Sequence, residues 1–170
     1  LGSATPMDHM LRDLSIMKAN NVNMVRTSHY PNDPRFPELC DRLGIYVCDE
    51  ADIETHGMQV DGAWSLLTDS PEWTEAYLDR AMRMMERDKN HASILMWSVG
   101  NESGIGRNHR AMADYFHTRY PGAIVHSEDA TRNLASEQDL TKWVNCDYID
   151  IDSRMYPSPE NCLKFYIDNK

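Results

Sequence analysis

The stretch WSVGNESG, residues 97–104, places an amide and a carboxylate side by side where an apolar segment ends. Asn101 and Glu102 follow the apolar run of residues 93–100, which predicts a buried strand. A carboxylate at the edge of a core costs free energy unless it is paired or used in chemistry. Glu102 is therefore a candidate general acid or base, and the alternative is a carboxylate near the amide dipoles of a helix start.

A second polar pair, Glu54 and His56, follows the apolar segment of residues 45–53. Residues two positions apart in an extended segment face the same side. With Glu102, these side chains could bind a divalent cation: carboxylates suit magnesium, and the histidine makes manganese or zinc chemically compatible as well. A solvated loop is the alternative interpretation of this segment.

Apolar segments that alternate with helical patterns predict a parallel α/β fold. The predicted strands cover residues 22–30, 45–53, 93–100, 123–128 and 147–156. Helices are predicted to begin at Pro6, Pro34, Pro71 and near Asn108. Polar residues follow or end successive strands: Arg26, Ser28 and His29; Asp52, Glu54 and His56; Asn101 and Glu102; Glu128; and Tyr156.

Two architectures share this alternation, the open doubly wound sheet and the closed eight-stranded barrel. The sequence lacks the glycine-rich turn by which many open sheets bind phosphate, because GNESGIG has the wrong spacing. Barrels of this type build their active sites from the carboxyl ends of several strands. The polar residues at successive strand ends therefore favour the barrel.

Composition narrows the classes of function. The chain has 170 residues, of which 41% are hydrophobic and 26% charged, as in an ordinary globular domain. A net charge of -10 argues against binding to nucleic acid or to an anionic membrane, and no apolar run approaches the ~20 residues of a membrane span. The four cysteines lack metal-binding spacing and are expected to be core or near-core thiols.

Four segments resemble the catalytic barrel of family two glycoside hydrolases, in particular the large bacterial β-galactosidases. They are VRTSHYPNDP (25–34), DEADIETHG (49–57), RDKNHASILMWSVGNESG (87–104) and MYPSP (155–159). The resemblance extends from about Met10 to Tyr156 and implies an incomplete TIM (β/α)8 barrel with about five of eight parallel strands. IETHG favours the β-galactosidase branch over the β-glucuronidases, which share the GNE strand end.

The resemblance also implies roles for individual residues. Glu102 would be the general acid/base of a retaining glycosidase, and Asn101 would contact the sugar hydroxyl beside the reacting carbon. His29 matches a histidine that contacts galactose, and Arg26 matches an arginine near the nucleophile. Tyr156 matches a tyrosine that hydrogen-bonds the nucleophile.

The implied metal site consists of Glu54, His56 and Glu102, with magnesium as its ion and manganese as a second option. Asp49 and Glu50 are expected inside the barrel without a chemical role. A metal-dependent hydrolase that uses the same three ligands is one alternative function. A non-catalytic sugar-binding or scaffold module is another.

The nucleophile of the family lies in a CEY-type motif on a later strand, and the sequence ends at Lys170 before such a motif. We therefore expect residues 1–170 to be part of the catalytic barrel of a larger multidomain glycosidase that acts on terminal β-D-galactosides. Alone, the chain should be inactive. Open sheet edges, with Val47, Leu95 and Met96 no longer enclosed, predict a homo-oligomer.

Overall fold

The computed structural model describes residues 4–128, 146–151, 153, 156 and 158–168. Four strands form one parallel sheet in the order β1-β2-β3-β4. They are β1 (Met24–Arg26), β2 (Tyr46–Glu50), β3 (Ile94–Ser98) and β4 (Val125–His126). Spatial order follows chain order, as in a barrel, whereas a doubly wound sheet reverses direction at a switch point. The predicted barrel architecture is confirmed.

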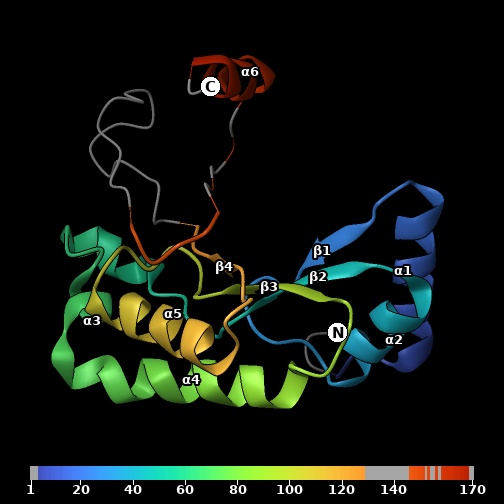
Figure 1. Ribbon diagram of the computed structural model, residues 1–170, viewed down its shortest axis with the longest axis horizontal. Coiled ribbons are helices and arrows are strands. Elements are labelled where there is room, and N and C mark those ends of the chain that lie inside the picture. Colours follow the sequence, from blue (N-terminus) through green and yellow to red (C-terminus); the bar gives the residue numbers. More distant parts are fainter. Residues whose placement is uncertain (1–3, 129–145, 152, 154–155, 157, 169–170) are drawn as a thin grey trace.

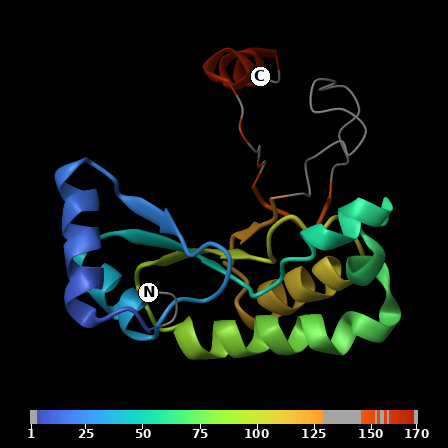
Figure 2. The same ribbon diagram turned by 180° about the vertical axis from the view of Figure 1, so that it is seen from behind.

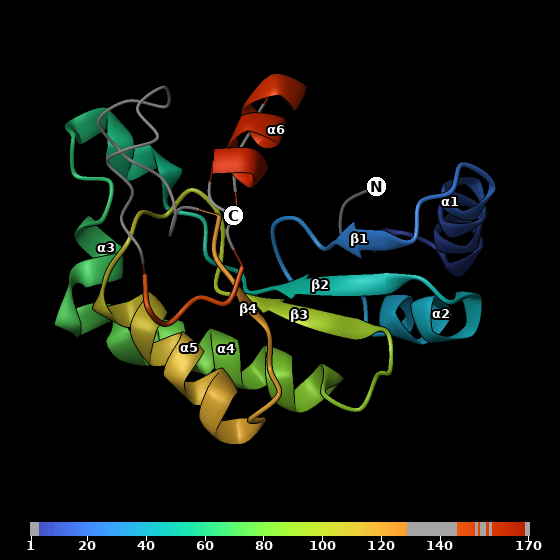
Figure 3. The ribbon, with the colours of Figure 1, turned by 45° about the horizontal axis from the view of Figure 1, so that its top comes forward.

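The longer helices in the body lie on one face of the sheet (Figure 3). The helices are α1 (Met7–Ala19), α2 (Arg35–Leu43), α3 (Leu66–Asp69), α4 (Thr74–Asp88), α5 (Arg107–Arg119) and α6 (Pro159–Asp168), with 3-10 turns η2 (His56–Asp61) and η3 (Pro71–Trp73). α1 and α2 lie beside β1 and β2, whereas α4 and α5 cover β3 and β4; α6 stands apart from this body (Figures 1 and 2). Among the described residues, no helix combines the length and apolar character that crossing a membrane requires.

Two apolar clusters attach the helices to the sheet. The larger joins α4 and α5 to the strands, and its fully buried members include Ala81, Met85, Val99, Met112, Phe116 and Val125. The smaller joins α1 and α2 to β2 and includes Leu14, Cys40, Ile45 and Val47. The expectation that Val47 faces the barrel interior is therefore wrong, because its side chain packs on the helix side. Cys40, Cys48 and Cys146 are buried thiols, as predicted.

Local chemistry explains where α2 begins and ends. Asp33 Oδ1 accepts a hydrogen bond from the Arg35 backbone amide at 2.9 Å, which satisfies a free donor of the first turn. Gly44 ends the helix in the left-handed conformation, with φ +66°, which a glycine adopts without a side-chain clash. The chain can then enter β2 directly.

The predicted fifth strand, residues 147–156, does not form in the described residues. Asp147 and Tyr148 lie in a turn, and residues 149–151 are irregular. Asp150 bonds to Val125 of β4 twice: its amide donates to the Val125 carbonyl at 3.0 Å, and its Oδ2 accepts from the Val125 amide at 2.8 Å. A side-chain carboxylate thus occupies a position that a strand backbone would fill. β1 and β4 are the edges of the described sheet, and association through them stays a prediction.

Gly100 joins β3 to the polar turn, and we expect its replacement by alanine to destabilise the chain. Its φ is +142°, and a Cβ atom would lie 2.7 Å from both the Cβ and the carbonyl oxygen of Ile53. Gly100→Ala should lower the free energy of unfolding by about 1–3 kcal/mol, measured by urea denaturation. Gly57 is the control, because a Cβ there meets nothing within 4 Å. Equal losses in both variants would contradict the close-contact argument.

Asp49 should make stability fall as the pH rises. Burial, assisted by the neighbouring Asp88 carboxyl, raises the pKa of Asp49 from 3.8 to about 8. The folded chain therefore keeps a proton that the unfolded chain releases near pH 4, so stability declines between about pH 4 and pH 8. Asp49→Asn should remove up to a few kcal/mol of that decline in urea titrations at pH 5 and pH 8. If the free energy of unfolding fell equally with pH in the variant and in the unsubstituted chain, this assignment to Asp49 would be refuted.

Candidate active site

The segments after β2 and β3 run side by side, which brings Glu54 next to Asn101. Their backbones form a parallel bridge, in which the Asn101 amide donates to the Ile53 carbonyl at 2.9 Å. The Asn101 side-chain nitrogen donates to Glu54 Oε2 at 2.8 Å. Glu102 follows with φ +39°, in the left-handed region that is costly for a residue with a side chain. Strain of this kind is typical of functional sites.

Glu54, His56 and Glu102 converge as the sequence predicted. One donor atom from each lies within 4.8 Å of the others. His56 Nδ1 is 2.5 Å from Glu102 Oε2, and His56 Nε2 is 2.7 Å from Gln59 Oε1. With a cation bound, the neutral His56 ring would carry its hydrogen on Nε2, donated to Gln59 Oε1, and Nδ1 would turn its lone pair to the ion in place of the direct contact with Glu102. Two carboxylates and an imidazole lone pair fit a divalent cation.

Arg26 connects the interior of the sheet to Asn101. Its Nη2 donates to Asn101 Oδ1 at 2.7 Å, and its Nε donates to Glu50 Oε2 at 2.5 Å. The Asn101 amide is therefore held at both ends, by Arg26 on its oxygen and by Glu54 on its nitrogen. His29 Nδ1 lies 2.8 Å from Glu50 Oε1. Glu50 thus joins the two residues, Arg26 and His29, that were expected near the sugar.

The sequence reasoning missed the contacts that Glu50 makes with residues of the candidate site. Glu50 was expected inside the barrel without a chemical role, and its side chain is indeed 0% exposed. Its contacts with Arg26 and His29 nevertheless tie it to the site. The period-two alternation of β2 turns Cys48 and Glu50 to the same face of the sheet, and this pattern could have been used to place Glu50 from the sequence.

Tyr156 is not brought to this group. Its side chain is 90% exposed, and its φ is +49°. Neighbouring residues 152, 154–155 and 157 lie outside the described part of the chain. The role of Tyr156 beside a nucleophile therefore stays a prediction.

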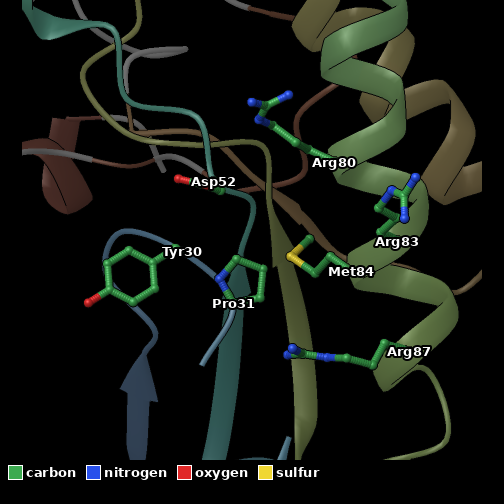
Figure 4. A pocket seen from close by; sticks show the side chains of 7 residues that line it. All are labelled: Tyr30, Pro31, Asp52, Arg80, Arg83, Met84 and Arg87. Carbon is green, nitrogen blue, oxygen red and sulfur yellow. The ribbon is translucent and has the colours of Figure 1, made fainter. Parts of the chain in front are cut away.

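A separate hollow of about 490 Å³ lies between α4 and the segments that follow β1 and β2 (Figure 4). It is lined by Tyr30, Pro31, Asp52, Arg80, Arg83, Met84 and Arg87. Asp52, one of the polar residues expected at the strand ends, thus lies here and away from the Glu102 group. Arg83 is paired with Asp79, and Arg87 is paired with Asp88. The Glu102 group is the better candidate site, because two carboxylates and an imidazole converge there.

The chain is similar to known proteins over most of its length. A β-galactosidase of Vibrio vulnificus (strain YJ016) is 50% identical over 136 residues, which cover 80% of this chain and 13% of that protein. A β-galactosidase of Streptococcus thermophilus is 44% identical over 176 aligned positions, 99% of this chain and 16% of that protein. The chain therefore spans only a small part of the relatives it matches.

Solved structures show the same fold. A β-glycosidase from Bacteroides vulgatus aligns with a TM-score of 0.63 and 30% identity, over 78% of this chain and 17% of that one. A β-glucuronidase from Bifidobacterium dentium aligns with a TM-score of 0.55 and 28% identity, over 78% of this chain and 22% of that one. The family model described as glycosyl hydrolases family 2, TIM barrel domain, matches residues 1–170. The chain therefore belongs to family 2 of the glycosyl hydrolases and is part of their TIM barrel domain.

Proposed function

We propose that the enzyme containing this chain hydrolyses terminal β-D-galactosides with retention of configuration. The position of the Glu102 carboxylate, at the end of β3 beside Asn101, Glu54 and His56, carries this proposal. Curated relatives that are 44% and 54% identical are named β-galactosidases. A β-glucuronidase structure is 28% identical, so a glucuronide is the second candidate substrate. Membership of family 2 weakens the scaffold and metallohydrolase alternatives.

Glu102 would act first as an acid and then as a base. Its O–H proton would pass to the glycosidic oxygen as the bond from that oxygen to the sugar carbon breaks; a second carboxylate, the nucleophile, would bond to that carbon and the alcohol would leave. The resulting Glu102 carboxylate would then take a proton from the water that attacks the sugar carbon and releases it from the nucleophile. Retention requires a second carboxylate about 5–5.5 Å away. We place that nucleophile outside residues 1–170.

Asn101, His29 and Arg26 would bind and orient the sugar and the nucleophile. The Asn101 amide is fixed at both ends, so it can hold a sugar hydroxyl in a defined position. His29 anchors Nδ1 on Glu50 and is 43% exposed, which leaves Nε2 available to a sugar hydroxyl. Arg26 would supply a fixed positive charge that favours an ionised nucleophile.

Magnesium would be held by Glu54, His56 and Glu102, and manganese has compatible chemistry. When bound, the cation would supply a fixed positive charge beside Glu102. The chain itself prepares the ligands: Asn101 donates to Glu54, and Gln59 sets the hydrogen of His56 on Nε2.

In the full-length enzyme, Glu102→Gln should abolish acid assistance to the leaving group. Hydrolysis of alkyl β-galactosides, whose leaving groups need a proton, should fall about 10²–10⁴-fold. Cleavage of the glycosidic bond in a dinitrophenyl β-galactoside should fall much less, as measured by pre-steady-state release of dinitrophenol. A similar loss of this first step for both substrates would show that Glu102 is not the acid. The matching β-glucuronides, tested with the original enzyme, separate the two candidate substrates.

His56→Ala should weaken the metal dependence of the full-length enzyme. After chelation, we expect about 10–100-fold more magnesium to restore half of the activity, because a ligand and its oriented ring are lost. His117→Ala is the control, since His117 is a partly exposed histidine paired with Asp150 away from the site. Manganese binding, followed by electron paramagnetic resonance, should weaken in the His56 variant alone. Unchanged manganese affinity would remove His56 from the ligand set.

A further inference from the structure

We propose that Glu50 is a positioning residue for the hydrolysis described above, which holds Arg26 and His29 in place through its two carboxylate oxygens. The inference rests on the proposed function of the site. It assigns to Glu50 no contact with the sugar, because the side chain is 0% exposed. Glu50 would act only through the residues that it binds.

Each oxygen of Glu50 has a defined partner. Oε1 accepts from His29 Nδ1 at 2.8 Å, and Oε2 accepts from Arg26 Nε at 2.5 Å and from the Ser98 hydroxyl at 2.8 Å. A carboxylate only accepts, so the hydrogen of the neutral His29 ring must be on Nδ1. Glu50 thereby decides which ring nitrogen of His29 has a lone pair for the substrate.

Strand register supplies the third donor. Glu50 pairs with Ser98, and Ser98 pairs with His126, so these residues form a row across β2, β3 and β4. The hydroxyl of Ser98 has one hydrogen, which goes to Glu50; His126 must then donate from Nδ1 to the Ser98 oxygen at 3.0 Å. Burial, and the charge of Arg26, lower the pKa of His126 to about 4, so the ring is neutral near pH 7. His126 Nε2 then accepts from the Ser153 hydroxyl at 3.0 Å.

The effect of Glu50 reaches Asn101 through Arg26. Arg26 Nε is bound by Glu50, and its Nη2 donates to Asn101 Oδ1. Hydrogen bonds to a sugar hydroxyl beside the reacting carbon strengthen in the transition state. A displacement of about 1 Å at such a contact can cost on the order of 100-fold in rate. Loss of Glu50 should therefore weaken transition-state binding more than ground-state binding.

The test compares Glu50→Gln with Asp49→Asn in the full-length enzyme. Both positions hold buried acidic side chains on β2, but Asp49 faces Thr27 and Asp88 on the opposite side of the strand. Glutamine presents an NH₂ group to one of the donors around position 50. We expect kcat for an aryl β-galactoside and the affinity for galactonolactone to fall about 100-fold. The affinity for an uncleaved thiogalactoside should change less than about 3-fold, and Asp49→Asn should change all three less than about 3-fold.

Equal weakening of lactone and thiogalactoside binding by Glu50→Gln, or the same profile in Asp49→Asn, would overturn the proposal. If Glu50→Gln does not fold, Glu50→Asp keeps the charge and should show the same selectivity with a smaller loss of about 10-fold. An original enzyme that cleaves no β-galactoside would refute the proposed function instead. The crystal structure of the Glu50→Gln enzyme would still test the positioning role, and Arg26 and His29 side chains in unchanged positions would contradict it.

Discussion

A buried carboxylate needs hydrogen-bond donors, and this requirement at Glu50 organises the interior edge of the sheet. An unpaired charge there would cost several kcal/mol. Arg26, His29 and Ser98 meet the requirement, and each comes from a different part of the chain: β1, the segment after it, and β3. The residues that satisfy Glu50 include those expected to bind substrate, so the interactions that make this interior stable also shape the site.

Parallel strands extend this arrangement to the loops. Because successive strands point the same way, their carboxyl ends meet at one edge. Beyond β2 and β3, the backbone bridge between Glu54 and Asn101 continues the pairing, and Gly100 allows the close approach of Ile53. Glu102 thereby lies beside His56, and a divalent cation could bind both side chains in place of their direct contact. The backbone pairing beyond the strands thus positions the side chains of the candidate site.

The sequence predicted the alternation of strand and helix well, because apolar periodicity and proline or glycine signals are local. The turn at Gly44 is such a case. In the described residues the predicted fifth strand does not form, and the contact found there is not local: the carboxylate of Asp150 accepts from the backbone amide of Val125, 25 residues earlier. Periodicity alone could not reveal that contact.

Some residues of the candidate site were likewise predicted from the sequence, and others were not. Glu54, His56 and Glu102 were predicted together mainly because their segments resemble a known family, and the structure brings them together. Alternation along β2 could place Glu50 on the same face as Cys48, but its partners lie 24 and 48 residues away, and spacing does not identify them. Tyr156, predicted by resemblance, lies exposed in the described structure.

In the proposed mechanism, Glu102 is the acid/base and a carboxylate outside residues 1–170 is the nucleophile. Trapping the full-length enzyme with an activated 2-deoxy-2-fluoro-β-galactoside, followed by peptide mass spectrometry, would identify the nucleophile directly. We predict a covalent sugar on a carboxylate outside residues 1–170, with its oxygen about 5–5.5 Å from Glu102 in the crystal structure. A sugar attached to Glu102 or Glu54, or a separation of about 6.5–9.5 Å, which is typical of inverting enzymes, would contradict the account.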